Sequence, residues 1–569
     1  MKRSQKKASE QHAPVRRADI GIPAQAEEPA EAVQPVARER KAGKTGLTRT
    51  TATVLMMVGL LLSKITGQLR EILIVPVFGG LGVESDAFLI GFQIPDLFYQ
   101  LLVGGAIQAA ITPTLSAVIE RRQEKKGWRS ISIFINLAAV AMLLAVLIGE
   151  VAAPGLIALY NQGKDPAVIE LAVRVTRALF PQVFFMMLAA LCIGILNAYR
   201  KFASTSFGPS IYNICVVLAM VLLGQASASG VVRVASGVMA SALIYFLFQF
   251  YLARKAFQHY VFSFDYHDPG FRRLLYLAVP TLISGSIVQV NTIILTAFAR
   301  QFTGAVTALR QATTTWQLPY GVFVIAIGNV MLPSLARAHA AGQQSEGRTL
   351  YSSSLRSALF LVFPSAALFL AMQQDTIRAI FQWSSHYTDA GVVVTASILR
   401  WYCIAMVAQT FVFITNQAFY ARRVTRIALY NGVLNLLLNA LFCLLLTRWS
   451  NLGVSSLSFA YMLTSLISAF LLYMLYSRGF PGAAPKKLWP FMIRCALCTC
   501  ALILMVLLAG KLPFDPEGKI AQLVWYAVRA LFGSAAYLAV AWLLRMPESR
   551  QFISHLNGLA GRLRGRPAA

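Results

Sequence analysis

The chain is 569 residues long, 57% hydrophobic and only 13% charged. A soluble globular protein carries about 25% charged residues, so a chain of this size with half that fraction cannot cover itself with a water-facing surface. A soluble enzyme and a disordered scaffold are therefore excluded, and the composition predicts a surface that faces lipid. The formal net charge of +28 raises nucleic-acid binding as one explanation, which the placement of the charges tests.

Residues 1–50 differ from the rest of the chain. They hold 11 Lys/Arg and 6 Asp/Glu among Ala, Pro and Gln, and they lack the apolar segment and the cleavage site of a signal peptide. This composition predicts a disordered basic tail.

From about Thr51 onward, apolar runs recur that are long enough to cross about 30 Å of hydrocarbon. They predict fourteen membrane-spanning helices, joined by short polar connections that leave no extramembrane domain of catalytic size. The expected spans cover residues 52–77, 85–118, 130–152, 167–199, 206–224, 231–256, 271–300, 305–336, 350–373, 388–420, 427–447, 453–477, 488–510 and 521–544.

The basic residues are distributed unevenly between the two sides of these spans. With the N-terminal tail in the cytoplasm, the cytoplasmic segments hold 35 of the 51 Lys/Arg and the opposite loops hold 5, while 11 lie within spans or at their ends. This is a positive-inside pattern, and it supports an even number of spans with both termini in the cytoplasm. The charge therefore reports topology, and no nucleic-acid partner is expected.

A weak internal repeat divides the chain. The string TPTLSA around Pro113 recurs as LPSLAR around Pro333, and an offset of 220 residues spans six crossings, an even number. The repeat predicts two six-helix lobes related by a pseudo-two-fold axis along the membrane normal, with a substrate site at their interface and two extra C-terminal helices. The expected parts are a tail (1–50), an N-lobe (51–260), a C-lobe (261–480), two helices (481–545) and a basic tail (546–569).

Enzymatic and metal-binding motifs are missing. The Cys495-x-x-Cys498 pair has the spacing of half a zinc site, but it lies in an apolar span with no second pair nearby. The chain has no HExxH motif and no phosphate-binding GxxxxGK[ST] motif, so neither a cofactor nor ATP hydrolysis is expected. The sequence predicts a transporter rather than an enzyme.

Span 1 contains SKITGQLRE, in which Lys64, Gln68 and Glu71 recur on one helical face, with Ser63 and Arg70 beside them. Ionisable residues within a membrane usually face a cavity or a partner. These residues are therefore expected to line a cavity or, alternatively, to form pairs that fix helix packing. Span 2 adds Asp86 near its outer start and Asp96 directly after Pro95.

Two further groups of polar residues interrupt the apolar spans. Arg310 lies early in span 8, one turn before Thr314. Asn431, Asn435 and Asn439 recur every four residues along span 11, where amides either form hydrogen bonds between helices or offer oxygen ligands to a monovalent cation.

The string SKITGQLREILIVPVFGGLGVESDAFLIGFQIPDLF resembles the start of the MurJ (MviN) family of lipid II flippases, within the multidrug, oligosaccharidyl-lipid and polysaccharide exporter superfamily. The likeness continues through ILNAYRKFASTSFGPSIYNI, VMLPSLARA and QAFYARRVTRIA and covers most of residues 52–480. The fold of this family, two six-helix lobes and two added helices, agrees with the repeat.

The resemblance implies a substrate-binding site. Ser63, Lys64, Arg70 and Asp86 occupy positions where the family has functional polar residues in its central cavity, and Arg310 is a further candidate for binding. Members often carry an arginine where this chain has Tyr99 and Thr314, so its cavity is expected to be less cationic. The family's proposed sodium site uses acidic residues in spans 7 and 11, where this chain has none in span 7 and only asparagines in span 11.

The expected function is movement of lipid II, an undecaprenyl-pyrophosphate-linked precursor, from the inner to the outer leaflet by alternating access. In that reading Lys64 and Arg70 engage the pyrophosphate, and Asp86 contributes to an outer gate or binds the headgroup. Partners are the lipid-linked precursor, membrane lipids and either a monovalent cation or the membrane potential. The rival functions are a flippase for another lipid-linked oligosaccharide, such as an exopolysaccharide or O-antigen unit, a cation-coupled drug exporter and a membrane scaffold.

Overall fold

The computed structural model describes residues 49–102, 111–112, 114–116, 118–119, 123–161, 165–199, 201, 205–299, 302, 304–422, 424–480, 488–512 and 517–550. Every regular element in these residues is a helix, which confirms the expected all-α class. The expected N-terminal tail lies outside the described residues except for Arg49 and Thr50, and the expected C-terminal tail lies outside them from residue 551 onward.

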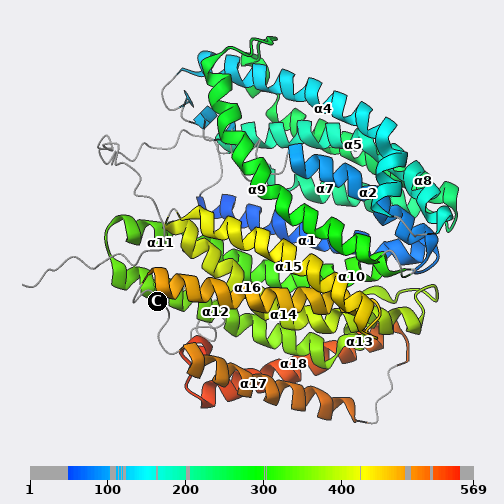
Figure 1. The fold of residues 1–569 in the computed structure, drawn as a ribbon, viewed down its shortest axis with the longest axis vertical. Coiled ribbons are helices and arrows are strands. Elements are labelled where there is room, and N and C mark those ends of the chain that lie inside the picture. Colours follow the sequence, from blue (N-terminus) through cyan, green and yellow to red (C-terminus); the bar gives the residue numbers. More distant parts are fainter. Residues whose placement is uncertain are drawn as a thin grey trace, which may run out of the picture.

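The first helices form one packed group in the upper half of Figure 1. At its centre α5 packs against α2, α4 and α8, while α7 packs against α1 and α8. The members of this N-terminal group are α1 (Arg49–Phe78), α2 (Val83–Leu102), α4 (Glu124–Tyr160), α5 (Pro166–Ala198), α7 (Gly208–Leu223) and α8 (Ala228–Ala253).

A second group lies below the first in Figure 1, and α14 is its centre. This helix packs against α10, α11, α12, α13 and α16, and α15 packs against α16. The members of this C-terminal group are α10 (Ala305–Pro319), the π-helical η2 (Tyr320–Ile325), α11 (Ala326–Ala340), α12 (Gln344–Ala371), α13 (Gln373–Phe381), α14 (Asp389–Ala421), α15 (Thr425–Trp449) and α16 (Ser455–Gly479).

The remaining long helices connect or extend the two groups. α9 (Pro269–Ala299) starts beside α4 and runs obliquely past α2 to reach α15 and α10, as Figure 1 shows. The 3₁₀ turn η1 (Ala256–His259) precedes it. α17 (Leu488–Gly510) and α18 (Lys519–Leu543) pair with each other and lie against α12 and α13 at the edge of the second group.

Length and composition explain why these segments are helices in lipid. Ten helices in the described part of the chain are long and apolar enough to cross a membrane. A segment that spans a membrane has to be helical or part of a closed barrel, because hydrocarbon offers its backbone no hydrogen-bond partners. Each of the fourteen expected ranges overlaps a helix. The short helix α13 is an element that the sequence analysis did not anticipate.

The helices differ in how much of their surface other helices cover. Of the apolar window of α5, 67% is buried inside the protein, against 11% for α18. Large apolar side chains such as Val151 and Leu222 point outward, with 81% and 76% of their surface exposed. This outward apolar surface agrees with the lipid-facing surface that the composition predicts.

Close helix contact depends on small residues at two places. A Cβ atom at Gly91 of α2 would lie 2.4 Å from Cγ1 of Val175 on α5, and one at Gly149 of α4 would lie 2.3 Å from the ring of Phe180. Only glycine lets the backbones approach so closely, which is the usual way in which membrane helices gain packing energy.

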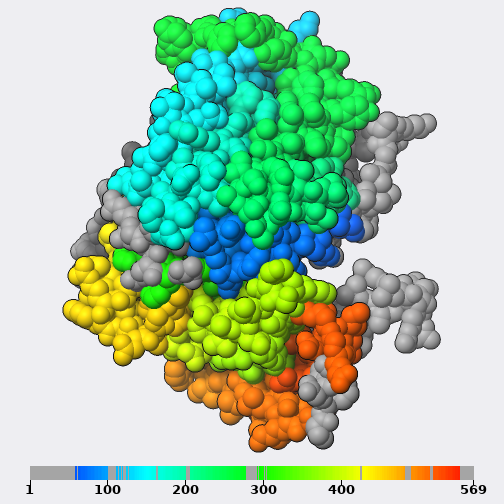
Figure 2. All heavy atoms as spheres, turned by 90° about the vertical axis from the view of Figure 1, so that its right-hand side faces the viewer, coloured from blue at the N-terminus to red at the C-terminus, as the bar shows by residue number. Residues whose placement is uncertain are grey.

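The two ends of the helix bundle have different character. One end, here called the turn end, carries the turn 79–82, Gly304 and the loop 382–388. The opposite end, here called the basic end, carries Arg254, Lys255, Arg337, Arg422 and Arg478. Figure 2 looks onto the turn end, where the blue residues of α1 and α2 lie directly against residues of the second group.

Candidate functional site

A cluster of three charged side chains joins the two helix groups. Glu71 of α1 is only 4% exposed, although it lies in an apolar helix. Its carboxylate accepts hydrogen bonds from Arg310 of α10 at both oxygens, Nε to Oε2 at 3.2 Å and Nη2 to Oε1 at 3.0 Å. Nη2 of Arg70 donates to the same Oε1 at 2.8 Å. One carboxylate therefore holds two guanidinium groups, one from each helix group.

Both guanidinium groups remain partly open. The side chain of Arg70 is 23% exposed and that of Arg310 is 41% exposed, whereas Glu71 is enclosed between them. A bidentate arrangement of this kind is strong, because two parallel N–H···O bonds reinforce the charge attraction. The open faces of the two arginines leave donors free to meet a further anion.

Further residues of α1 and α2 lie near this cluster. Asp96 interacts electrostatically with Arg310, Arg70 and Glu71, and Tyr99 interacts with Asp96. The Nε2 atom of Gln68 is buried without a hydrogen-bond partner among the described residues. Five of the predicted residues, Arg70, Glu71, Asp96, Tyr99 and Arg310, thus lie near one another, although Arg310 is more than 200 residues from the others in the sequence.

Asp86 of α2 makes a second contact between the groups, at the turn end. Its carboxylate accepts hydrogen bonds from the backbone N–H of Gly304 at 3.0 Å and of Thr307 at 3.1 Å, and from Oγ1 of Thr307 at 2.9 Å. Gly304 has φ of 72° and precedes α10 with no side-chain cap of its own. A carboxylate from another helix therefore caps α10, where it also faces the positive end of the helix dipole.

Neighbouring residues complete this contact. An added Cβ at Gly304 would lie 3.1 Å from Leu81, and one at Gly391 would lie 2.8 Å from the same side chain. The hydroxyl of Tyr387 donates to Oε1 of Gln311 at 2.7 Å, which ties the loop before α14 to α10. The turn end is consequently closed by packed and hydrogen-bonded residues of both groups.

The charge cluster lies beneath this closure. Arg310 is five residues into α10 and Glu71 seven residues from the end of α1, which places both about 8–10 Å from the turn end at 1.5 Å per residue. Lys64 lies a further two turns along α1 and is exposed. The sequence leaves two roles open for these residues, cavity lining and pairing. Glu71 is paired with two arginines, whereas Lys64 is exposed.

Two other predicted residues make local contacts. The Oγ1 atom of Thr314 donates to the carbonyl of Gln311 in its own helix at 3.0 Å. The carbonyl of Ser63 accepts from Nδ2 of Asn213 on α7 at 3.3 Å, which fixes α1 against α7. Whether these side chains touch a substrate stays a prediction.

The asparagines of α15 take part in hydrogen bonds between helices. Asn431 accepts from Oγ of Ser468 on α16 at 2.7 Å, and Nδ2 of Asn435 donates to the same hydroxyl at 3.4 Å. Nδ2 of Asn439 donates to Oδ1 of Asn291 on α9 at 2.7 Å. These contacts favour the first of the two expected roles, hydrogen bonding between helices.

Sequence reasoning missed the partners of Asp86. Gly304 and Thr307 carry no motif, and the only local signal is a glycine three residues before a threonine at the start of an apolar run. The pairing joins residues more than 200 positions apart, so no local pattern reveals it.

A multi-pass helical membrane protein with charged residues gathered between two helix groups has the architecture of a transporter. The family model for the lipid II flippase MurJ matches residues 75–529. This is most of the chain, and the chain belongs to that family, which confirms the resemblance seen in the sequence.

The similarity to relatives that carry the same family name covers most of this chain and most of each relative. A probable lipid II flippase MurJ from Rhizobium meliloti is 29% identical over 423 residues, which are 72% of this chain and 77% of the relative. The lipid II flippase MurJ of Burkholderia cenocepacia is 26% identical over 505 residues, with 85% and 95% covered.

Solved structures share the fold. One of a lipid II flippase MurJ in an inward closed conformation aligns with a TM-score of 0.72 at 20% identity, covering 88% of this chain and all of that one. An inward-facing multidrug resistance MATE family transporter of the MOP superfamily aligns with a TM-score of 0.61 at 15% identity, covering 78% and 98%. Both likenesses concern the fold alone.

Proposed function

We propose that this protein moves lipid II from the inner to the outer leaflet of the bacterial cytoplasmic membrane by alternating access. The observation that carries the proposal is the convergence of Arg70 and Arg310 on Glu71, because it puts two guanidinium groups at the contact between the helix groups. Guanidinium groups suit a pyrophosphate, since their planar donors match phosphate oxygens.

Glu71 acts in this proposal as the internal partner of the arginines when no substrate is bound. A pyrophosphate entering from the basic end meets the exposed Lys64 first and then the open faces of Arg70 and Arg310. It competes with the Glu71 carboxylate for the same donors, and this competition weakens the link between α1 and α10. Ser63, Gln68, Asp96, Tyr99 and Thr314 are proposed to line the path of the headgroup.

The proposed architecture has fourteen spans, two six-helix lobes related by a pseudo-two-fold axis along the membrane normal and two C-terminal helices. The two helix groups correspond to the lobes, with α9 as the first helix of the second lobe. Rocking of one lobe against the other opens one end while the other is closed. The contact of Asp86 with α10 is the closed state of the turn end.

Both termini and the basic end are proposed to face the cytoplasm, and the 35-to-5 distribution of basic residues supports this orientation. A cysteine introduced at Ser385, in the exposed loop of the turn end, should react with a membrane-impermeant maleimide added to intact cells. A cysteine at Gln343, at the basic end, should react only after the membrane is permeabilised. The reverse labelling pattern would refute this orientation.

The energy source is proposed to be the membrane potential or a gradient of a monovalent cation. The hydrogen bonds of Asn431, Asn435 and Asn439 favour the potential, because the amides already serve helix packing. A charge that crosses the whole membrane gains about 2.3 kcal/mol per 100 mV. The membrane potential would act directly on the charges of Arg70 and Arg310 if these side chains move across the membrane.

The function is tested in cells depleted of their own lipid II flippase. The unaltered chain should restore growth, and Arg310→Ala or Lys64→Ala should abolish it with lipid II accumulating in the inner leaflet. Arg174→Ala, which removes an exposed arginine of α5, is the control and should restore growth fully. Both variants must be present in the membrane at the level of the control.

The outcome separates the rival functions. Full growth with both Arg310→Ala and Lys64→Ala overturns the proposed roles of these residues. Failure of the unaltered chain to relieve lipid II accumulation overturns the lipid II assignment itself. Accumulation of a different lipid-linked oligosaccharide in a deletion strain of the native host would indicate that this oligosaccharide is the substrate. This alternative is considered because Tyr99 and Thr314 occupy positions where members of the family often have arginine.

A further inference from the structure

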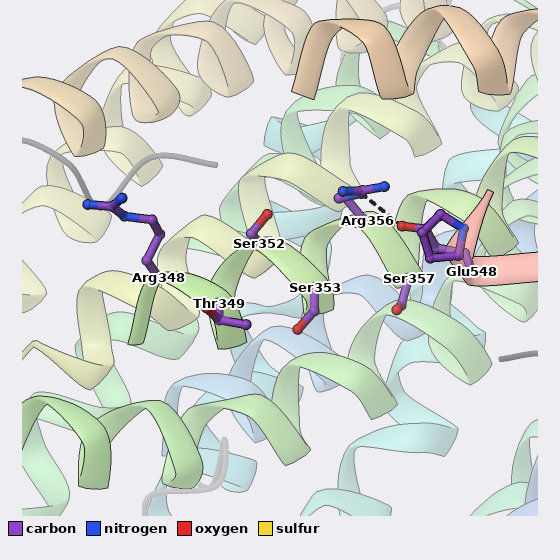
Figure 3. A pocket seen from close by; sticks show the side chains of 8 residues that line it. Arg348, Thr349, Ser352, Ser353, Arg356, Ser357 and Glu548 are labelled. Carbon is purple, nitrogen blue, oxygen red and sulfur yellow. Dashed lines mark ion pairs between the residues drawn. The ribbon is translucent and has the colours of Figure 1, made fainter. Parts of the chain in front are cut away.

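A cavity of about 320 Å³ lies far from the charge cluster, at the basic end between α12 and the residues that follow α18 (Figure 3). It is lined by side chains that are almost all polar. The lining residues are Arg348, Thr349, Ser352, Ser353, Arg356, Ser357, Pro547 and Glu548.

The polar lining comes from one helix in a regular pattern. Arg348, Ser352 and Arg356 follow one another at intervals of four residues and therefore project from the same side of α12, as Figure 3 shows. The hydroxyls of Thr349 and Ser353 donate to the carbonyls of Ser345 and Leu350 in their own helix. Guanidinium groups supply only hydrogen-bond donors, and their planar N–H groups match phosphate oxygens.

The two arginines of the cavity differ in their partners. Nε of Arg356 lies 2.8 Å from Oε1 of Glu548, and its guanidinium stands over the ring of Phe491 on α17 at 4.9 Å. Arg348 forms no ion pair with the described residues, and the Nε atoms of both arginines are buried without a hydrogen-bond partner among them. Glu548 thus neutralises Arg356, and Arg348 keeps the positive charge of the cavity.

Residues after α18 form the opposite wall. Met546 and Ser549 are fully buried and Glu548 is 8% exposed, although the sequence analysis assigned these positions to a basic tail. Their packing against α12 fixes Glu548 within the cavity. The site is therefore built from two separate parts of the chain, not from a single surface helix.

The neighbouring surface is apolar and faces lipid. The helix α17 turns the buried Phe491 toward Arg356 and exposes Trp489 at 76%, Ile493 at 49% and Leu497 at 53% on its opposite side. Basic pockets between helices at the cytoplasmic side of membrane proteins bind anionic lipid headgroups.

We propose that this cavity binds the phosphate of an anionic phospholipid, with Arg348 and Ser352 as its donors. The site is separate from the proposed lipid II path, because it is formed by α12 and residues 547–548 rather than by α1, α2 and α10. A bound lipid fixes residues 546–550 against α12. Glu548 limits the affinity by holding Arg356.

The test uses the purified full chain in nanodiscs of phosphatidylcholine with a rising fraction of phosphatidylglycerol. The number of phosphatidylglycerol molecules retained after detergent extraction is counted by native mass spectrometry. Arg348→Gln should lower this retention about fivefold, as expected for one basic residue beside an anionic lipid. Arg478→Gln, the same change in an exposed arginine at the same end, should not alter it.

A second pair of variants separates binding from stability. The change Ser352→Ala should also lower retention, while Glu548→Gln should raise it by releasing Arg356. A purely structural role would instead make Arg348→Gln and Glu548→Gln change in the same direction. The melting temperature of each variant in pure phosphatidylcholine shows that it is folded.

Three results would overturn the proposal. The first is equal retention by Arg348→Gln and Arg478→Gln, and the second is a fall in retention with Glu548→Gln. The third is a rise in melting temperature with inorganic phosphate in phosphatidylcholine nanodiscs that equals the rise with phosphatidylglycerol. That result would show that the cavity binds a soluble anion.

Discussion

At the scale of single residues, Glu71 determines what the two neighbouring arginines can do. A buried carboxylate without a partner destabilises the folded protein. Removing one partner of a buried ion pair therefore lowers stability, because it leaves the other charge uncompensated. Here Arg310 is 41% exposed, so solvent screens part of the attraction and the coupling is smaller than for a fully enclosed pair. The cluster is therefore strong enough to link α1 and α10 and weak enough to be released.

A double-mutant cycle measures this link. Glu71→Gln and Arg310→Gln should each destabilise the purified protein by about 1–3 kcal/mol, because each leaves a charge without its main partner. The double variant should be less destabilised than the sum, with a coupling energy of about 1 kcal/mol or more. Thermal unfolding in detergent provides the measurement.

The matched control is the pair Glu170 and Arg174 on the exposed side of α5. These residues lie 3.7 Å apart with side chains 77% and 52% exposed, so their coupling should stay below about 0.5 kcal/mol. An equal coupling energy in the two cycles would contradict the special position of Glu71.

At the scale of the elements, α2 is held between two partners. Its middle packs closely on α5 at Gly91, where Oγ1 of Thr176 also donates to the glycine carbonyl at 3.1 Å. Its beginning carries Asp86, which caps α10 in the other helix group. The position of α2 on α5 therefore sets the position of the cap.

Gly91→Ala tests how tightly α2 and α5 are packed. The added methyl group would lie 2.4 Å from Val175, so the helices must separate or Val175 must move, and the variant should lose about 1–3 kcal/mol of stability. Gly155→Ala in α4 is the control, because no atom lies within 4 Å of the new methyl group. It should be neutral or slightly stabilising in the same thermal unfolding measurement.

At the scale of the whole molecule, the two helix groups meet at the turn end and the charge cluster lies beneath that contact. α9 crosses from one group to the other, so it is the covalent and packed connection between them. A transporter of this shape needs a closure that is stable but reversible. The single carboxylate of Asp86, with three hydrogen bonds to α10, meets both conditions.

Asp86→Asn should shift the molecule toward a state that is open at the turn end. The change keeps one acceptor but removes the charge that faces the helix dipole, at a cost of about 1 kcal/mol or about a fivefold change in the equilibrium. A cysteine at Thr314, beneath the closure, should react about fivefold faster with an impermeant maleimide added from the turn end. Labelling of the parent chain without this cysteine gives the background.

Asp389→Asn is the control for the closure. Its carboxylate lies at the same end, is 76% exposed and pairs with Arg378 at 3.2 Å, so its loss should leave the labelling rate unchanged. An unchanged rate with Asp86→Asn as well would show that its hydrogen bonds to α10 do not hold the turn end closed.

Much of the site could be predicted from span 1 because its pattern is local. Lys64, Gln68 and Glu71 lie within two turns of one helix, and their common face follows from 3.6 residues per turn. The partner of Glu71 could not be predicted in the same way. Arg310 is 239 residues away, and only the packing of α1 beside α10 brings the two side chains together.

The sequence by itself determined that this protein lies in a membrane, where its helices run and how its basic residues are divided between their ends. These properties are local, because hydrocarbon requires each spanning segment to be long, apolar and hydrogen-bonded within itself. Only the tertiary structure decided that Asp86 caps α10, that Glu71 holds two arginines and that Glu548 enters a cavity beside Arg356. Those contacts join distant segments, and their existence depends on how whole helices pack against one another.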